Sequence, residues 1–165
     1  MLFLFDASAF ITANNTYYPI ERVPEFWEWI AHQASLGNVK LPLEIFDEVL
    51  PGRKKDDPLP DWMKDHRYAI LLDEAVDPML VQRVLNEGYA ADLTDDELEE
   101  IGRDPFLVAY AMAGPDRCVV TSESSSPKKQ RKNRRIPDVC STFGVKCTEP
   151  FYVYRTLGFS TAWRR

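Results

Sequence analysis

The sequence predicts an α/β protein with three layers, in which helices cover both faces of a central parallel sheet. Short apolar or β-branched segments alternate with helix-like segments along the whole chain. The first of these segments, residues 2–5, contains four apolar residues with no polar interruption. A strand without apolar/polar alternation is typical of a parallel sheet, because such a strand is buried on both faces.

The length and composition indicate one globular domain spanning residues 1–165, large enough to form a core without disulfides. We expect no membrane association, because no apolar run approaches the roughly 18 residues that a spanning helix needs. The apolar N-terminus also lacks the basic segment of a signal peptide. The odd number of cysteines, without a CxxC pair, predicts buried thiols in a reducing, cytoplasmic setting; they are Cys118, Cys140 and Cys147.

Apolar periodicity and residues that start or stop helices predict the remaining elements. We expect further strands at residues 39–41, 68–72, 117–121 and 145–147. We expect helices at residues 7–13, 22/24–35, 43–50, from 61, 78–87, 94–102, 104–113, 137–144 and 150–157, with loops at 53–60 and 122–135. Thr94 and Glu97 have the spacing of a capping box, and Asp104 is expected to be the N-cap of its helix.

Acidic residues recur just after the predicted strands, or early in the helix that follows; they are Asp6, Glu44, Glu48, Asp104, Glu123 and Asp138. In a parallel sheet these positions share the carboxyl edge, where α/β proteins bind their ligands. Each acid also has a local explanation: Asp6 suits a helix cap, and Asp138 suits a helix N-terminus. For Asp6 alone, both explanations stay open.

Convergence on one edge would make these acids a metal site. Several carboxylates packed together repel one another unless they are protonated or neutralised by a cation. Mg²⁺ or Mn²⁺, which prefer oxygen ligands, would neutralise them economically. Two such ions can activate a water molecule and stabilise the leaving oxygen in phosphodiester hydrolysis.

Four segments, taken together, resemble the motifs of PIN-domain ribonucleases. They are residues 5–11 (FDASAFI), 41–49 (LPLEIFDEV), 104–111 (DPFLVAYA) and 119–123 (VVTSE). Residues 136–140 (IPDVC) resemble the segment that one PIN-like branch carries after the fourth motif. The order and spacing of the segments agree with the family over nearly the whole chain.

The resemblance implies a three-layer fold and a catalytic, metal-binding site made by Asp6, Glu48, Asp104 and a fourth acid. Many members are VapC-type toxins that cleave RNA with Mg²⁺ or Mn²⁺ and are paired with a cognate antitoxin protein. The resemblance leaves open whether this protein forms a homodimer. The fourth motif here has Ser122-Glu123 where Asn-Asp is common, so either Glu123 or Asp138 completes the metal site. Ser8, Glu44 and Thr121 are the candidates for orienting the metal ligands.

A basic loop, defined as residues 124–135, is an insertion relative to compact members of that family. It carries six cations within eight residues, so the rest of the chain has a charge of −12 against the net −6. These cations are Lys128, Lys129, Arg131, Lys132, Arg134 and Arg135. We expect them to bind the RNA backbone, although contact with an acidic surface of the same protein or of a partner stays open.

Three functions compete at this point. The leading prediction is a metal-dependent endoribonuclease, and the altered fourth motif supports the alternative of a PIN-like module that binds nucleic acid or a partner without cleaving it. A phosphatase of the haloacid-dehalogenase type would use Asp6 as nucleophile and needs a second Asp two residues later. That position is Ser8, which disfavours the phosphatase.

Overall fold

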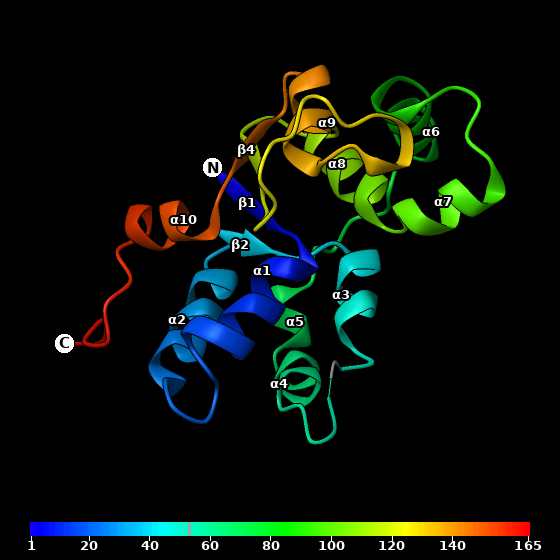
Figure 1. Cartoon of the computed structure of the whole chain (residues 1–165). Helices are drawn as coiled ribbons and strands as arrows, with labels where there is room; N and C mark the ends of the chain where they lie inside the picture. The colour runs from blue at the N-terminus through cyan, green and yellow to red at the C-terminus, as the bar shows by residue number, and fades with distance from the viewer. Residues whose placement is uncertain (53) are drawn as a thin grey trace.

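The computed structural model describes residues 1–52 and 54–165 and has the expected three layers (Figure 1). Within these residues, four parallel strands form one sheet in the order β2-β1-β3-β4. The strands are β1 (Leu2–Phe5), β2 (Val39–Lys40), β3 (Arg117–Val120) and β4 (Lys146–Thr148). Because the winding of the chain reverses beside β1, the carboxyl end of β1 lies at the kind of crevice where α/β sheets bind ligands.

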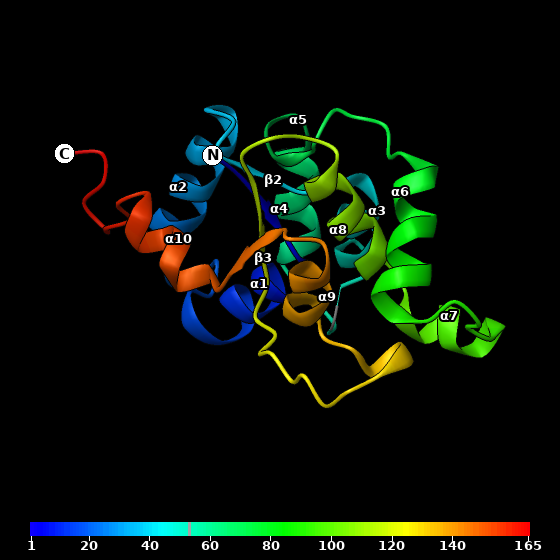
Figure 2. The same cartoon turned by 90° about the horizontal axis from the view of Figure 1, so that it is seen from above.

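Helices pack on both faces of the sheet. One face carries α1 (Ala7–Thr12), the π-helical turn η1 (Ala13–Tyr17), α2 (Pro24–Ser35) and α10 (Pro150–Thr156). The other face carries α8 (Asp104–Met112) and α9 (Ile136–Thr142). Figure 2 shows this division from above, with α2 and α10 to the left of the strands and α8 and α9 to their right. The short helix α3 (Leu43–Val49) follows β2 and packs against α1.

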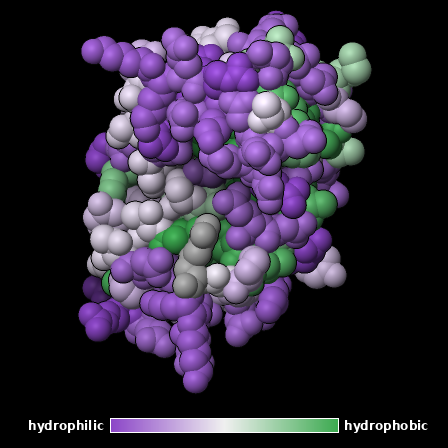
Figure 3. Space-filling model, turned by 45° about the vertical axis from the view of Figure 1, so that its right-hand side comes forward, coloured by the Kyte–Doolittle hydropathy of each residue, from purple (hydrophilic) through white to green (hydrophobic). Residues whose placement is uncertain are grey.

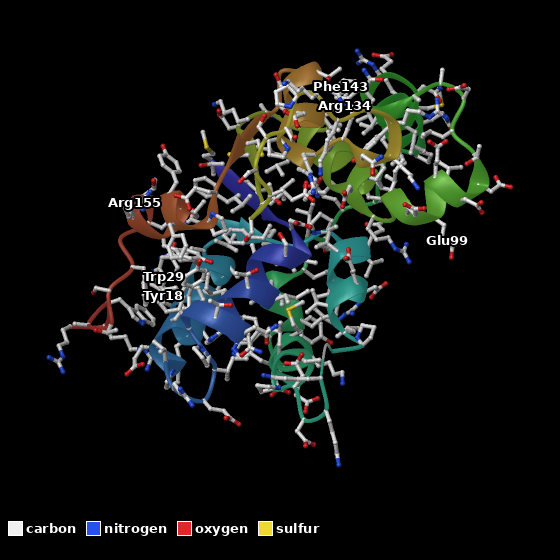
Figure 4. All side chains as sticks on the ribbon, in the orientation of Figure 1. Tyr18, Trp29, Glu99, Arg134, Phe143 and Arg155 are labelled. Atoms are coloured by element: carbon white, nitrogen blue, oxygen red, sulfur yellow. The ribbon has the colours of Figure 1, made fainter. Side chains whose placement is uncertain are left out.

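Aromatic side chains fill the core on the α1–α2 face. Trp27 and Trp29 are almost fully buried, and the indole N–H of Trp27 donates to the carbonyl of Tyr18 at 2.6 Å. The rings of Phe10 and Phe26 pack edge-on against Trp27. Figure 4 shows Tyr18 and Trp29 together on this face. This packing fixes α1, and therefore the position of the residues at the end of β1.

The strand expected at residues 68–72 is wrong. Residues 59–70 instead form α4 (Leu59–Asp65) and α5 (Arg67–Ile70), and Leu71 makes one isolated bridge to Leu41. Tyr68 is 99% exposed, so burial of its side chain does not stabilise a strand at this position. The expected loop at residues 53–60 begins at Arg53, which lies outside the described residues, and α4 starts one residue before its end.

Two helix starts on the other face differ in how well the sequence predicts them. The capping box of Thr94 and Glu97 is confirmed at the start of α7 (Asp95–Ile101). The capping role expected for Asp104 is wrong: Arg103 occupies the N-cap position of α8, and no side chain caps that helix. The Asp104 carboxylate therefore has no local structural task at the start of α8.

The helix expected at residues 78–87 is divided into two parts. A regular helix, α6 (Pro78–Arg83), continues into a π-helical turn, η2 (Val84–Tyr89). Val84 is fully buried, whereas α6 itself has no fully buried residue. The wider turn rotates the end of the segment, so that Gly88 and Tyr89 are buried.

In the described part of the chain, none of the helices has the length and apolar character that crossing a membrane would require. The three cysteines are free thiols: Cys118 and Cys140 are buried, and Cys147 is partly exposed. The expectation that all three are buried is thus wrong for Cys147, which lies on the edge strand β4.

Candidate active site

Strand β1 delivers Asp6 to the carboxyl edge of the sheet. Its backbone N–H donates to the carbonyl of Val120 at 2.8 Å, and the residue is only 5% exposed. One carboxylate oxygen, Oδ2, accepts hydrogen bonds from the hydroxyl of Thr121 at 3.0 Å and from that of Ser8. The side chain caps no backbone N–H of α1. Helix capping, the simpler explanation of Asp6, therefore does not account for its carboxylate.

The same two hydroxyls connect Asp6 to the segment after β3. Ser8 Oγ accepts the backbone N–H of Ser122 at 3.3 Å, and Thr121 Oγ1 accepts that of Glu123 at 3.1 Å. Burial raises the pKa of Asp6, and the bonds from Ser8 and Thr121 oppose this increase only in part. Ser8 and Thr121 thus orient the Asp6 carboxylate, which is the geometry that the orienting role predicted for them requires.

Asp104 lies at the start of α8, close to the other acids. Burial, together with the charges of Asp6, Glu123 and Glu48, raises its pKa to about 8. Arg135 opposes this increase. Among the described residues, no hydrogen bond reaches the Asp104 carboxylate. The four predicted acids, Asp6, Glu48, Asp104 and Glu123, therefore lie close enough to act on one another, and we call them the acid cluster.

Glu123 and Asp138 occupy different surroundings. The Glu123 carboxylate accepts the backbone N–H of Ile136 at 2.9 Å and pairs with Arg135 at 3.2 Å. Its charge is among the main ones that raise the pKa of Asp6 and of Asp104, whereas that of Asp138 is not. Glu123, rather than Asp138, is the fourth member of the cluster.

Asp138 instead fastens the start of the basic loop. Its carboxylate accepts the hydroxyl of Ser125 and the backbone N–H of Ser126, the latter at 2.8 Å. Burial alone would raise the pKa of Asp138, but these two hydrogen bonds and the charge of Arg134 outweigh burial and lower it. The hydrogen bonds give Asp138 a structural task at the beginning of the loop.

Glu44 and Glu48 share one face of α3 but meet different parts of α8. Glu48 acts on Asp104 in the first turn. Glu44 lies against Tyr110, whose pKa is raised to about 12 by burial and then by the charge and hydrogen bond of Glu44. Six residues of helix, about 9 Å, separate Asp104 from Tyr110. The structure therefore brings Glu48 to the acid cluster and leaves Glu44 beside it.

The acid cluster has the chemistry of a divalent-cation site. Within the described residues, no group of three or more His, Cys, Asp or Glu side chains is arranged to hold a metal ion. The donors of the acid cluster are nevertheless all carboxylates, which Mg²⁺ and Mn²⁺ prefer. Burial, and then the charges of the neighbouring acids, raise the pKa of Asp104, and a bound cation would lower it again. Asp6, Asp104 and Glu123 would hold such an ion.

A polar cleft of about 220 Å³ adjoins the acid cluster on the α8–α9 face. Its lining includes the acids Glu100, Asp104 and Glu123. The cations that line it are Lys129, Lys132, Arg134 and Arg135. A cleft with carboxylates beside several cations suits a phosphodiester, because the cations can bind phosphate oxygens that the carboxylates would otherwise repel.

The basic loop is fixed to the protein by several of its own cations. Arg131, in the short 3-10 turn η3 (Arg131–Asn133), binds Glu97 through two parallel hydrogen bonds of 2.8 and 2.7 Å, and Asp92 at 2.7 Å. Lys132 pairs with Glu100. The loop thus lies on the acidic surface of α7, one of the two contacts that the sequence left open. Figure 3 shows a largely hydrophilic surface where α6 and α7 come forward.

The other loop cations divide into two groups. The guanidinium of Arg134 donates to the carbonyls of Gly88 and Asp138. Lys128 and Lys129 are exposed and form no ion pair with the described residues. Of the six cations predicted to bind RNA, these two are the most available to an external anion.

Arg131 should control the order of the basic loop. Its backbone φ of 54° is unfavourable for a residue with a side chain, so the ion pairs must hold it there. We expect Arg131→Gln to speed backbone amide exchange across residues 124–135 by about tenfold or more, as measured by hydrogen–deuterium exchange. Lys128→Gln, the matched control, should leave exchange unchanged. Equal exchange rates in wild type and Arg131→Gln would contradict the role of the Arg131 ion pairs in ordering the basic loop.

Tyr89 is a site residue that sequence reasoning missed. It is 7% exposed, and its hydroxyl has no hydrogen-bond partner among the described residues. Burial raises its pKa, and the charges of Asp104 and Glu123 raise it further. The π-helical turn η2 places it there, and such turns are frequent at functional sites. No motif marks it, because the turn depends on tertiary packing.

Comparison with known proteins identifies a family but no named function. The family model described as "Domain of unknown function (DUF4411)" matches residues 3–161. No curated protein and no solved structure matches the chain. Because the match extends from the first strand past the last helix, the chain belongs to the DUF4411 family.

Proposed function

We propose that this protein is a metal-dependent endoribonuclease that hydrolyses RNA phosphodiester bonds. One observation carries the proposal: carboxylates from separate segments meet at the carboxyl edge of a parallel sheet, where burial, together with the charges of Asp6, Glu123 and Glu48, raises the pKa of the Asp104 carboxyl to about 8. That carboxyl also borders a cleft lined with cations. Structural acids are ordinarily separated or paired, so this concentration of negative charge favours a cation-binding site.

The contacts of each residue indicate its role in the proposed reaction. Asp6, Asp104 and Glu123 would hold Mg²⁺ or Mn²⁺, with Glu48, whose charge also acts on Asp104, as a further ligand. Such an ion supplies an activated water and stabilises charge on the leaving oxygen. Ser8 and Thr121 fix the orientation of Asp6 through their hydroxyls. Lys128 and Lys129 would bind the RNA backbone, as would the cations that line the polar cleft.

The test is cleavage of RNA by the purified protein with and without divalent metal. We expect endonucleolytic cleavage of a mixed-sequence RNA in Mn²⁺ or Mg²⁺, complete loss in excess EDTA, and recovery when Mn²⁺ is added back. Gel electrophoresis of an internally labelled RNA measures all three. Cleavage that persists in EDTA would contradict a metal-dependent site, and no cleavage with either metal would contradict the nuclease.

A second candidate is an RNA- or partner-binding module with the same fold and no cleavage. The pairing of Glu123 with Arg135 favours it, because this guanidinium already neutralises one carboxylate of the acid cluster. Isothermal titration calorimetry with Mn²⁺ separates the two candidates. An active site should bind Mn²⁺ in wild type and lose this binding in Asp6→Asn, whereas an inactive module should show no carboxylate-dependent binding.

The resemblance to PIN-domain ribonucleases extends the proposal to the cellular role. A VapC-type toxin would act in the cytoplasm and would be held inactive by a cognate antitoxin protein. A homodimer would be compatible with that role. Size-exclusion chromatography with light scattering measures the assembly state directly.

A further inference from the structure

A second cleft opens at the carboxyl edge of the sheet, on the face opposite the polar cleft. It encloses about 330 Å³ among α1, η1 and the start of α10, and Figure 1 shows α1 and α10 on that face. Four aromatic side chains line it, so we call it the aromatic cleft: Tyr17, Tyr18, Phe151 and Tyr154. Its volume lies at the lower end of the range for pockets that bind small organic groups.

Ser122 connects the aromatic cleft to the acid cluster. Ser122 is one of the residues that line the cleft. Its backbone N–H donates to Ser8 Oγ, and the Ser8 hydroxyl in turn donates to Asp6. The next residue, Glu123, belongs to the acid cluster. A strand of RNA whose phosphate lies at Asp6 would therefore reach the aromatic cleft within a short distance along the same edge.

The charges of the two clefts differ in a way that suits the two parts of a nucleotide. The polar cleft carries the cations. None of the residues lining the aromatic cleft is Lys or Arg, and its one charged residue is Glu149. The Glu149 carboxylate accepts hydrogen bonds from the N–H of Phe151 at 2.7 Å and from Arg155 at 2.9 Å, and keeps lone pairs for another donor. The aromatic cleft thus has no cation in its lining to bind a phosphate, and it suits a neutral group that carries hydrogen-bond donors.

Aromatic surface in the cleft is available for stacking. The Tyr17 ring meets the Phe151 ring edge-on, with centroids 4.8 Å apart and planes at 84°. Tyr17 nevertheless remains 52% exposed, so part of its ring is open to a ligand. Bases of single-stranded RNA stack on aromatic side chains of this kind largely irrespective of sequence.

We propose that the aromatic cleft binds a nucleobase of single-stranded RNA, next to the phosphate that lies at the acid cluster. The base stacks on Tyr17, and its donor groups face Glu149. The inference rests on the proposed function for the phosphate at the acid cluster, and it adds to it the substrate class: unpaired RNA with a splayed base.

RNA binding in EDTA tests the aromatic cleft without cleavage. The probe is a 5′-fluorescein mixed-sequence RNA heptamer, measured by fluorescence anisotropy. We expect Tyr17→Ala to weaken binding about 5- to 150-fold, the range for loss of one stacked base. Tyr17→Phe should bind within about twofold of wild type, because it keeps the ring. Tyr68→Ala removes a fully exposed tyrosine elsewhere and should also bind like wild type.

A heptamer of abasic ribose phosphates is the matched ligand control, and it should bind wild type and Tyr17→Ala equally. Equal binding of the intact heptamer by wild type and Tyr17→Ala would overturn the proposal, as would failure of wild type to bind it. If the aromatic cleft instead binds a side chain of a partner protein, wild type and Tyr17→Ala should also bind the intact heptamer equally, and the proposal would be wrong. RNA that binds through Tyr17 but is never cleaved would overturn the proposed nuclease activity. The same result would support the proposal that the aromatic cleft binds a nucleobase.

Discussion

Asp6→Asn is expected to lower the rate of RNA cleavage by at least about 100-fold while the fold stays intact. Asparagine keeps the shape of the side chain and an oxygen that can accept from Thr121 and Ser8. It removes the negative charge that a divalent cation needs. Loss of a residue that merely orients a metal ligand costs about 10- to 100-fold, so loss of the ligand itself should cost at least as much. Single-turnover cleavage in Mn²⁺ measures the effect.

Asp138→Asn is the matched control for Asp6→Asn. It makes the same chemical change in a nearby acid that binds Ser125 and Ser126 instead of joining the acid cluster. We expect its cleavage rate to stay within about threefold of wild type. Circular dichroism should show that both variants are folded. Full activity in Asp6→Asn, or a larger loss in Asp138→Asn, would contradict the assignment of the fourth acid and of the site.

Asp104→Asn is expected to stabilise the metal-free protein above neutral pH. In the unfolded chain this carboxyl loses its proton near its ordinary pKa of 3.8, whereas in the folded protein it keeps the proton up to about pH 8. Between these values Asp104 binds its proton in the folded state and not in the unfolded state, so the contribution of this carboxyl to stability falls as the pH rises. Asparagine cannot ionise, so the stability of the variant should decline less than that of wild type as the pH rises.

Thermal unfolding in EDTA at pH 5 and pH 8 measures the difference. At pH 8 the variant should unfold a few degrees above wild type, because in a domain of this size about 1 kcal/mol corresponds to roughly 2–4 °C. Added Mn²⁺ should raise the unfolding temperature of wild type and leave that of the variant unchanged. Asp73→Asn alters an exposed acid and should follow wild type. Equal pH dependence in Asp104→Asn and wild type would contradict the raised pKa.

The sequence was sufficient for the features that depend on local chemistry. Four consecutive apolar residues predict the buried strand β1, and the spacing of Thr94 and Glu97 predicts their capping box. The contact of Ser8 with Asp6 spans two residues, so strand-to-helix geometry alone brings them together. The alternation of such segments is also enough to predict the three-layer fold, because right-handed crossovers leave few other arrangements for parallel strands.

The tertiary structure decided the features that depend on which distant segments meet. Residues 68–72 have the composition of a strand, but the sheet offers Leu71 a single bridge and Tyr68 no buried site. Glu123 joins the acid cluster because it binds the N–H of Ile136, whereas Asp138 is held by Ser125. The hydrogen bonds that place Glu123 and Asp138 join residues 12 or 13 positions apart in the chain.

The sequence by itself therefore determined the fold class and the supply of acids at the carboxyl edge, because strand burial and chain direction are set by local pattern. Only the tertiary structure decided how these side chains are used. Arg131 binds Glu97 across 34 residues, and Tyr89 reaches the acids through a π-helical turn. Contacts of this range form only once the sheet has assembled, since they depend on the orientation of whole helices, which no local pattern encodes.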